Sequence, residues 1–251
     1  MKRSVLVIFL FTLFIQFSAG QGGSLWRMKR YELGIGLGPS FFFGDVGGYS
    51  QTINVLGFKD LTFLQTRFNI NGNIKYRITQ DVSVRASFTY GMFHATDERG
   101  SNPERAYEST ISFFEPLIIG EYYFIKNRTE RSWLFTKRRN ASFGSFFKAL
   151  DFYFLTGFGG INYSIKPNEA LATHGLDDKG FAAVIPVGFG SSIVFTPDVN
   201  FGIELAGRYS FTDNLDGYTS QFSSSNDVYY FLNFTITYKM KTGKNGLPQF
   251  R

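Results

Sequence analysis

The stretch Val199–Gly217, VNFGIELAGRYSFTDNLDG, alternates between apolar residues and polar or small ones. The apolar series is Val199, Phe201, Ile203, Leu205, Gly207, Tyr209 and Phe211, and the other series is Asn200, Gly202, Glu204, Ala206, Arg208, Ser210 and Thr212. Because a β-strand shows successive side chains to opposite sides, the pattern predicts a ribbon with one apolar face. Turn formers from Thr212 to Gly217 would end this strand. Repeated along the chain, such a pattern predicts a membrane-spanning β-barrel.

The N-terminus has the pattern of a secretory signal peptide. Lys2 and Arg3 precede an apolar run, Val5–Phe17, that is too short to span a bilayer as a helix. The small residues Ser18-Ala19-Gly20 follow it, as a signal peptidase requires. We therefore expect residues 1–20 to be cleaved and the chain to be exported by the general secretory route, the alternative being an uncleaved membrane anchor.

Composition supports a barrel over a soluble domain. No second apolar run is long enough for a transmembrane helix, and mean hydropathy is −0.09, which a barrel also gives because half of each strand faces inward. The chain is 19% aromatic, with 27 glycines and no cysteine. An exported chain without disulfides must be held together by packing or by a closed sheet. About 230 residues remain after cleavage, which suits one domain.

Eight segments show strand patterns, and an even number closes a barrel with both termini on one side. The expected strands are 32–43, 67–78, 82–93, 109–124, 151–163, 181–195, 199–212 and 228–238. The alternation is poor in 109–124, where Glu115 and Glu121 share a face with Leu117 and Ile119, and 151–163 is aromatic on both faces. The predicted fold is all-β, an eight-stranded antiparallel transmembrane β-barrel of up-and-down topology. The barrel would span 32–239, after an N-terminal segment 21–31 and before a basic tail 240–251.

The connections between these strands fall into two groups. The tight turns 79–81 and 196–198 would lie in the periplasm with the termini, and the longer connections 45–60, 94–108, 164–180 and 213–227 would lie outside. The predicted location is the outer membrane of a Gram-negative bacterium, in contact with its lipids.

Charged residues recur on the faces predicted to point inward. They are Glu32, Arg67, Lys75, Arg77, Arg85, Glu204 and Arg208, with Glu115 and Glu121 added from the fourth strand. An eight-stranded barrel is only wide enough for its own side chains, and an unpaired buried charge is costly. We therefore expect a plugged, salt-bridged lumen rather than a conducting pore.

One connection assigned to the periplasm, Lys126–Lys148, is long and basic. It carries seven basic residues against one acidic residue, a net charge of +6 that equals the formal net charge of the whole chain. Its predicted partner-binding residues are Lys126, Arg128, Arg131, Trp133, Lys137, Arg138 and Arg139. Three interpretations stay open: a solvated loop, an anchor to anionic lipid, and a docking surface for an acidic periplasmic partner. The periplasmic compartment excludes nucleic acid.

Catalytic and metal-binding patterns are sparse. The two histidines, His94 and His174, fall in predicted external loops, and a metal site or a triad needs more convergence. His94 with Asp97 and Glu98 could imitate part of a hydrolase site, and the turn residues Asp213, Asn214 and Asp216 resemble a fragment of a calcium loop. We expect loop and turn roles for all of them, with no enzyme activity, metal, cofactor or small-molecule substrate.

Two motifs resemble a known family. YELGIGLGPSFFFGDVGG (Tyr31–Gly48), RYSFTDNLDG (Arg208–Gly217) and the strand order between them resemble the small outer-membrane barrels of the PorG family of the type IX secretion system. The motif turn residues are Asp45, Asp213, Asn214, Asp216 and Gly217. The resemblance implies a non-enzymatic docking subunit beside a periplasmic ring of a lipoprotein and its partner protein. The chain departs from the pattern by running on after Tyr238, which places the expected assembly signal at 231–238. The alternatives are a stand-alone barrel that stabilises the envelope or binds through its loops, and a barrel-embedded enzyme.

Overall fold

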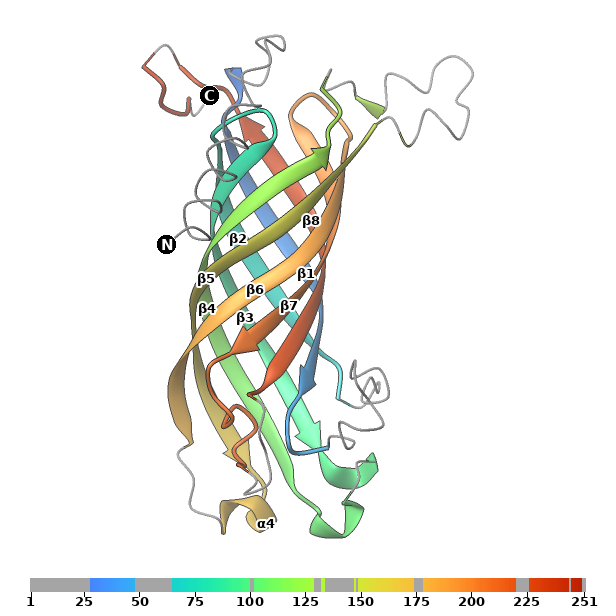
Figure 1. The fold of residues 1–251 in the computed structure, drawn as a ribbon, viewed down its shortest axis with the longest axis vertical. Helices are drawn as coiled ribbons and strands as arrows, with labels where there is room; N and C mark the ends of the chain where they lie inside the picture. The colour runs from blue at the N-terminus through green and yellow to red at the C-terminus, as the bar shows by residue number, and fades with distance from the viewer. Residues whose placement is uncertain are drawn as a thin grey trace, which may run out of the picture.

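The chain folds into a closed antiparallel barrel of eight strands, which confirms the predicted fold (Figure 1). The computed structural model describes residues 28–47, 65–99, 102–128, 132–133, 147, 149–173, 178–219, 226–243 and 245–249. The strands are β1 (Tyr31–Phe43), β2 (Arg67–Arg77), β3 (Val82–Thr96), β4 (Glu108–Ile125), β5 (Leu150–Pro167), β6 (Lys179–Val194), β7 (Val199–Ser210) and β8 (Val228–Met240). Each strand pairs with the next, and β8 pairs with β1 to close the sheet.

Several predictions concern residues outside these ranges. They are the signal peptide, Arg131, Lys137, Arg138, Arg139 and His174. They stay predictions from the sequence.

The two ends of the barrel differ in how the strands are joined. The tight turns after β2 and β6 lie at the same end of the barrel as the start of β1 and the end of β8, and so do the end of β4 and the start of β5 (Figure 1). Both tight turns use the sequence Thr-x-Asp, and Thr79 and Thr196 each accept the N–H of the first residue of the next strand, at 3.0 Å. We call this end the terminal end and the opposite one the loop end.

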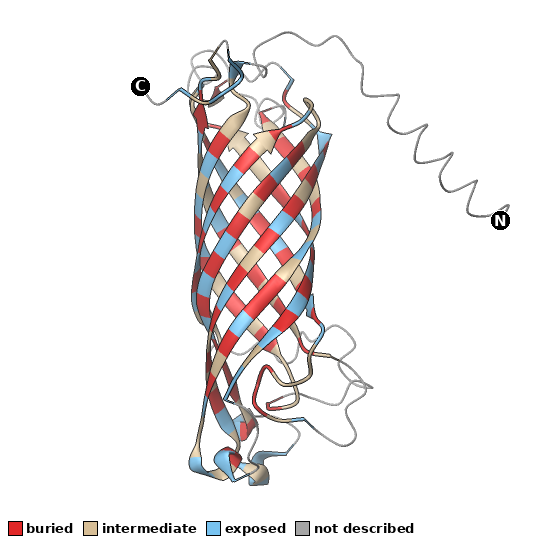
Figure 2. Cartoon of the chain, turned by 90° about the vertical axis from the view of Figure 1, so that its left-hand side faces the viewer, coloured by how far each residue is buried: buried red, intermediate tan, exposed pale blue. Residues whose placement is uncertain are grey.

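The wall of the barrel is uneven at the loop end. β4 and β5 have 18 residues each, whereas β2 has 11 and β7 has 12. The predicted fifth strand was therefore too short, because it stopped at Tyr163 and the structure continues to Pro167. Outward residues on the added part are polar, namely Ser164 and Lys166. The apolar pattern ends there while the backbone pairing with β4 goes on. β3 to β6 thus rise above the rest of the wall (Figure 2).

The outward face is apolar along the body of the barrel. Exposed large side chains include Phe68 at 72%, Leu37 and Phe189 at 61% and Phe234 at 55%. Buried and exposed positions alternate along every strand (Figure 2). A belt of this extent is the surface that a barrel shows to lipid. Among the described residues, no helix has the length and apolar character needed to cross a bilayer.

Proline interrupts the pairing at three places in the wall. The register passes from Leu37↔Phe234 to Ser40↔Phe231 around Pro39. It also passes from Phe114↔Asn162 to Leu117↔Gly159 around Pro116, and from Thr156↔Val187 to Gly159↔Val184 around Pro186. Proline has no N–H to donate to a ladder. Two of these interruptions flank the middle of β5, where Gly157, Gly159 and Gly160 lie.

The chain after β8 folds back at the terminal end. Gly243 donates to Leu247 and Gln249 donates to Lys241, both at 2.8 Å, so a small hairpin follows the last strand. Thr242 donates its N–H to Met28 O at 2.7 Å, which ties this hairpin to the segment before β1. Part of the predicted basic tail is thus an ordered element.

Candidate functional site: the barrel interior and its two ends

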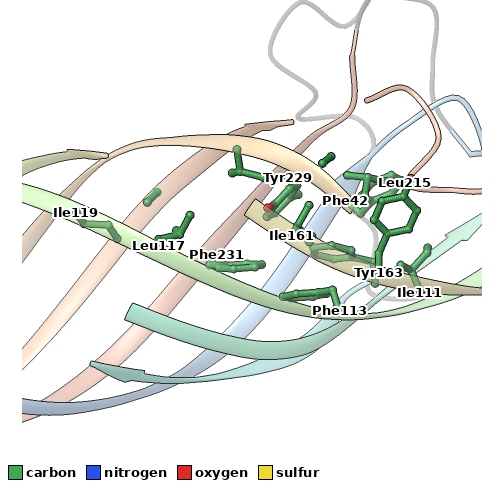
Figure 3. Packing of buried hydrophobic residues seen from close by; sticks show 14 of the residues in the cluster. Phe42, Ile111, Phe113, Leu117, Ile119, Ile161, Tyr163, Leu215, Tyr229 and Phe231 are labelled. Atoms are coloured by element: carbon green, nitrogen blue, oxygen red, sulfur yellow. The ribbon is translucent and has the colours of Figure 1, made fainter. Parts of the chain in front are cut away.

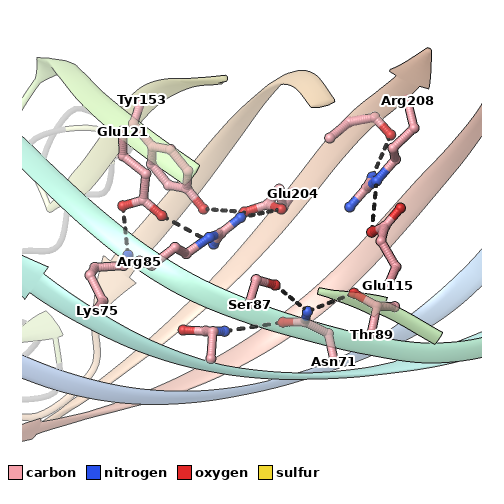
Figure 4. Close-up of polar contacts among 12 residues, drawn as sticks. Asn71, Lys75, Arg85, Ser87, Thr89, Glu115, Glu121, Tyr153, Glu204 and Arg208 are labelled. Atoms are coloured by element: carbon pink, nitrogen blue, oxygen red, sulfur yellow. Dashed lines mark hydrogen bonds and ion pairs between the residues drawn. The ribbon is translucent and has the colours of Figure 1, made fainter. Parts of the chain in front are cut away.

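The interior is divided along its length into two halves. Toward the terminal end the inward side chains are charged, and toward the loop end they are aromatic and aliphatic (Figures 3 and 4). A cavity of about 10 Å³ lies in the charged half, among residues that include Glu32, Lys75 and Arg85. That is about the room that one water needs. Around this cavity, the interior of the described part of the barrel is occupied by its own side chains.

Arg85 on β3 is the centre of the charged half. Its guanidinium binds both carboxylate oxygens of Glu204, at 2.7 and 2.8 Å, and lies 3.1 Å from Glu121 (Figure 4). Arginine suits this place because its planar group can serve two carboxylates at once. The hydroxyl of Tyr153 donates to Glu204 at 3.1 Å and that of Tyr123 to Glu121 at 2.9 Å. These bonds fix β3, β4, β5 and β7 to one another across the lumen.

A second group of charges lies beside the closing seam. Glu32 on β1 is 2.5 Å from Arg77 and 3.9 Å from Lys75, and Lys75 is also 2.8 Å from Glu121. Lys239 on β8 is the register partner of Glu32 and is only 1% exposed. Lys239 was predicted to lie at the end of the barrel but was not counted among the lumen charges. Its even spacing from Asn233, which points inward, was the signal that places it in the lumen.

Lys126, one of the predicted partner-binding residues, lies inside the barrel instead of on its surface. Its ammonium lies 2.8 Å from Asp151, and its side chain is 5% exposed. Asp151 also accepts the N–H of Asn127 at 2.6 Å. The ammonium therefore neutralises a buried carboxylate and is not available on the surface. The prediction failed because β4 ends at Ile125, and the next side chain still turns into the barrel.

A third ionic group lies nearer the loop end. Arg208 on β7 is 3.6 Å from Glu115, and Tyr229 donates its hydroxyl to Glu115. Arg208 also donates to Ala206 O at 2.7 Å and lies over the ring of Phe231 at 4.0 Å. This group therefore sits where the charged and apolar halves meet.

Of the predicted lumen charges, one lies apart. Glu32, Lys75, Arg77, Arg85, Glu204 and Arg208 lie in the interior as expected. Arg67 begins β2 at the loop end, is partly exposed, and donates to Thr66 O at 3.0 Å. Its place at the far end of β2 separates it from Lys75 and Arg77.

The apolar half was not predicted from the sequence. Phe93 stacks on Phe113 at 4.3 Å between ring centroids, and Phe113 stacks on Phe231 at 5.5 Å. Tyr229 packs against Phe93 at 4.9 Å, and aliphatic residues such as Ile111 complete the cluster (Figure 3). The poor alternation in 109–124 was the signal, because it marks a strand with apolar residues on both faces.

The two motif turns meet at the loop end. Asp216 accepts the N–H of Val46 at 2.8 Å and that of Tyr218 at 3.0 Å, so the turn after β7 holds the exit of β1. Asp227 accepts the N–H of Leu215 at 2.8 Å. Gly217 has a φ of +81°, which favours glycine. No sequence pattern indicated that the two motifs touch, since 170 residues separate Val46 from Asp216.

Asp45, Asp213 and Asn214 serve the same turns. Arg105 donates to the backbone oxygen of Asp45 at 2.9 Å. Thr219 donates to the backbone oxygen of Asp213 at 3.0 Å, and Asn214 donates its N–H to Thr212 at 3.3 Å. These are turn-forming contacts. Within the described ranges, no group of three or more metal-ligating side chains is found.

Burial changes the acidity of the carboxyls at this end. Asp216 is fully enclosed, and burial raises its pKa to about 7. Burial, with the nearby charge of Asp216, raises the pKa of Asp227 well above its usual range. In the closed structure both carboxyls therefore take up a proton at a higher pH than a free aspartate does.

The hydrolase-like group around His94 is not assembled. Asp97 binds Arg105 through both carboxylate oxygens, at 2.7 and 2.8 Å, and accepts the N–H of Gly47 at 2.8 Å. The His94 ring lies 3.3 Å from the Thr110 hydroxyl and 3.5 Å from Glu108. Asp97 is therefore a structural anchor for loops.

The terminal end exposes the start of the long basic connection. Arg128 has a side chain that is 66% exposed, 3.6 Å from Asp81. Ser132 donates its hydroxyl to Phe195 O at 2.5 Å, and Trp133 next to it is partly buried. The connection is thus fastened to the rim at two places before residue 134.

No protein-family model matches the chain, and no curated protein matches it. Among solved structures, Neisserial surface protein A (NspA) is 11% identical with a TM-score of 0.46, covering 83% of this chain and 96% of that one. Outer Membrane Protein W of E. coli is 14% identical with a TM-score of 0.37, covering 84% and 97%. OprG, an outer membrane protein from Pseudomonas aeruginosa, is 9% identical with a TM-score of 0.36, covering 83% and 96%.

The chain's own geometry defines its class. The closed eight-stranded sheet, the apolar exterior and the filled interior are those of a small membrane-spanning β-barrel.

Proposed function

We propose that the chain is a non-enzymatic barrel of the Gram-negative outer membrane that serves as a docking subunit of a protein secretion apparatus. Its terminal end would face the periplasm. The partner would be a periplasmic ring complex of a lipoprotein and its partner protein, as in the type IX system whose PorG family the two end motifs resemble. The filled lumen supports a structural role over transport.

The observation that carries the proposal is the fastened basic connection after β4. Periplasmic connections of such barrels are normally short turns. Here the connection leaves β4 at Lys126, held by Asp151, and binds the rim again at Ser132. These bonds hold the described residues 126–128 and 132–133 against the rim, and the basic residues Lys137, Arg138 and Arg139 follow them in the sequence. A positively charged segment that starts from a fastened base fits an acidic surface on a partner.

The test is recovery of partners from mildly solubilised outer membranes. The tagged wild type is compared with the triple variant Lys137→Glu, Arg138→Glu, Arg139→Glu. A matched control keeps the charge at the same three positions, Lys137→Arg, Arg138→Lys and Arg139→Lys. We expect ring subunits with the wild type and the control, and their loss with the triple variant.

Two other outcomes would change the proposal. Ring subunits that stay with the triple variant would keep the secretion role and move the contact to another surface. If neither the wild type nor the control recovers a ring subunit, the docking role fails.

The second candidate is a stand-alone barrel that stabilises the envelope or binds through its loops. The packed group at the loop end favours it, because Asp216 and Asp97 hold separate loops in one arrangement. Such a role should be indifferent to the triple charge reversal and sensitive to Asp216→Ala. Survival of cells under detergent stress, measured for both variants, distinguishes the two candidates.

A further inference from the structure

At the loop end, β3 to β6 extend beyond β2 and β7, and we call this extension the tall wall. As far as the structure describes the chain, it has two edges without a neighbouring strand, one on β3 and one on β6. The last pair between β2 and β3 is Asn69↔Gly91, and the last between β6 and β7 is Val184↔Ser210. Beyond these pairs, one side of β3 and one side of β6 have no strand beside them in the described part of the chain. A strand edge of this kind offers unpaired N–H and C=O groups to another chain.

The β3 edge is closed by side chains. Ser40 donates its hydroxyl to Met92 O at 2.7 Å, and Gln65 donates its amide to Thr96 O at 3.1 Å. Two carbonyls that face the missing neighbour are therefore satisfied. The segment that follows β1 also binds here, because Gly47 donates its N–H to Asp97, which follows β3.

The β6 edge is open by comparison. Phe211 donates its N–H to Ala183 O at 2.9 Å, so the backbone N–H and C=O groups of the odd-numbered residues of β6 point toward this edge. Ile165 donates its N–H to Asp178 O at 2.7 Å, so the backbone N–H and C=O groups of the even-numbered residues point toward β5. By this alternation, the N–H and C=O of Lys179 and of Phe181 face the open edge. Among the described residues, neither group has a hydrogen-bonding partner on that side.

The residues around the edge on the outward face are polar or small, apart from Phe181. Phe181 is 66% exposed and its outward neighbours across the β5 pairing are Asn162 and Ser164. Lys179 is exposed and pairs with Ser164, two residues from Lys166. The edge therefore joins free backbone groups to one aromatic side chain and two positive charges.

We propose that the edge Lys179–Ala183 of β6 binds an extended segment of another polypeptide, which adds a strand to the tall wall. Main-chain bonds to Lys179 and Phe181 would hold the segment. An apolar side chain would lie on Phe181, and an acidic one would face Lys179 and Lys166. Lysine on an edge also discourages indiscriminate pairing, so it would select for acidic segments.

The test uses a phage-displayed library of linear 12-residue peptides, panned on the purified barrel in lipid nanodiscs. An enriched peptide is then synthesised, and its Kd is measured for the wild type and for Phe181→Pro and Phe181→Ala. Proline removes only the N–H that faces the open edge, because that of Phe181 does not point to β5. Alanine keeps the N–H and removes the ring. We expect proline to weaken binding by about tenfold or more beyond alanine, from one lost main-chain bond and the clash of the ring.

Hydrogen exchange of the same complex keeps the proposal testable if Phe181→Pro fails to fold. The Lys179 and Phe181 amides of the wild type should exchange more slowly when the peptide is bound, and Lys179→Glu should abolish binding of acidic peptides. The proposal is overturned if no peptide is enriched. It is also overturned if bound peptides leave these amides unprotected, or if they bind Phe181→Pro and Phe181→Ala equally well. None of these outcomes depends on the terminal-end partner.

Discussion

Arg85 shows how single residues hold the lumen together. It is buried between Glu121 and Glu204, which come from opposite parts of the sheet. Taking these charges out of water is costly, and only their mutual bonds compensate for that cost. Removing one member therefore leaves charges that have no solvent and too few partners.

Arg85→Met should lower the free energy of unfolding by about 3–5 kcal/mol, because it strands buried carboxylates. Urea titration of the barrel in lipid vesicles, followed by gel mobility without heating, measures this change. The double variant Arg85→Met, Glu204→Met should recover part of the loss. Arg128→Met, at an exposed pair with Asp81, should cost less than about 1 kcal/mol. Equal effects of Arg85→Met and Arg128→Met would contradict the role of the buried network.

The carboxyl of Asp216 should make the loop end sensitive to pH. Its folded pKa, about 7, lies above its value in an opened loop, 3.8, so closing the loop takes up a proton between these values. Loop stability should therefore be greatest below about pH 4 and fall as pH rises to about 7. Exchange of the Val46 and Leu215 amides, corrected for intrinsic rates, should show protection falling by about tenfold or more between pH 5 and 8. Asp216→Asn should flatten this dependence, and a steep dependence in that variant would assign it to another group.

Whether a side chain points inward or outward could be predicted from odd and even positions alone only inside the strands. Glu32, Lys75 and Arg85 fall on the inward series and are buried as expected. Lys126 follows the last residue of β4, where parity no longer decides the direction of a side chain. The contact between Asp216 and Val46 depends on closure of the whole barrel, which no local pattern contains.

At the scale of strands, glycine positions differ sharply in what they tolerate. Gly38 on β1 faces inward, and a Cβ there would lie 1.9 Å from the backbone oxygen of Leu232. Gly72 on β2 faces outward with nothing within 4 Å of the same atom. The backbone of β8 would have to move for Gly38, whereas Gly72 has open space.

Gly38→Ala should therefore destabilise the barrel by about 1–3 kcal/mol. Gly72→Ala should be neutral or stabilise it by about 0.5–1 kcal/mol, because alanine loses less entropy on folding. The same urea titration compares the two variants. If Gly38→Ala is as stable as Gly72→Ala, the close approach of β1 and β8 is not tight.

Strand existence could be predicted from period two, but strand ends could not. Apolar residues stop at the lipid boundary, and this stop was taken for the end of pairing in 151–163. β5 continues to Pro167 because its backbone still finds β4, up to the pair Ser109↔Pro167. Beyond Tyr163 the alternation is inverted, with the polar Ser164 and Lys166 outward and Ile165 inward, so an apolar outward series does not reveal this part of the strand.

For the whole molecule, the two halves of the interior act as barriers in series. Either the Arg85 network or the stacked rings of Phe113 and Phe231 would obstruct an ion. In planar bilayers the wild type should give no conductance steps. Phe113→Ala with Phe231→Ala should also stay closed, because the charged barrier remains. Adding Arg85→Ala to that pair should be required for conduction, and sustained steps from the wild type would refute a plugged lumen.

The division of the interior also sets an order in which the sheet can be completed. An unfinished sheet in a bilayer shows its inner face to lipid, and the aromatic half, with Phe93 and Phe231, tolerates that contact. The charged half does not, since Glu204 on β7 reaches Arg85 on β3, and Lys239 on β8 comes alongside Glu32 on β1, only as the sheet closes. We expect the loop-end half to assemble first within the membrane. The other half would stay at the aqueous side until the last seam closes, so that neutralisation of charge is the final step of insertion.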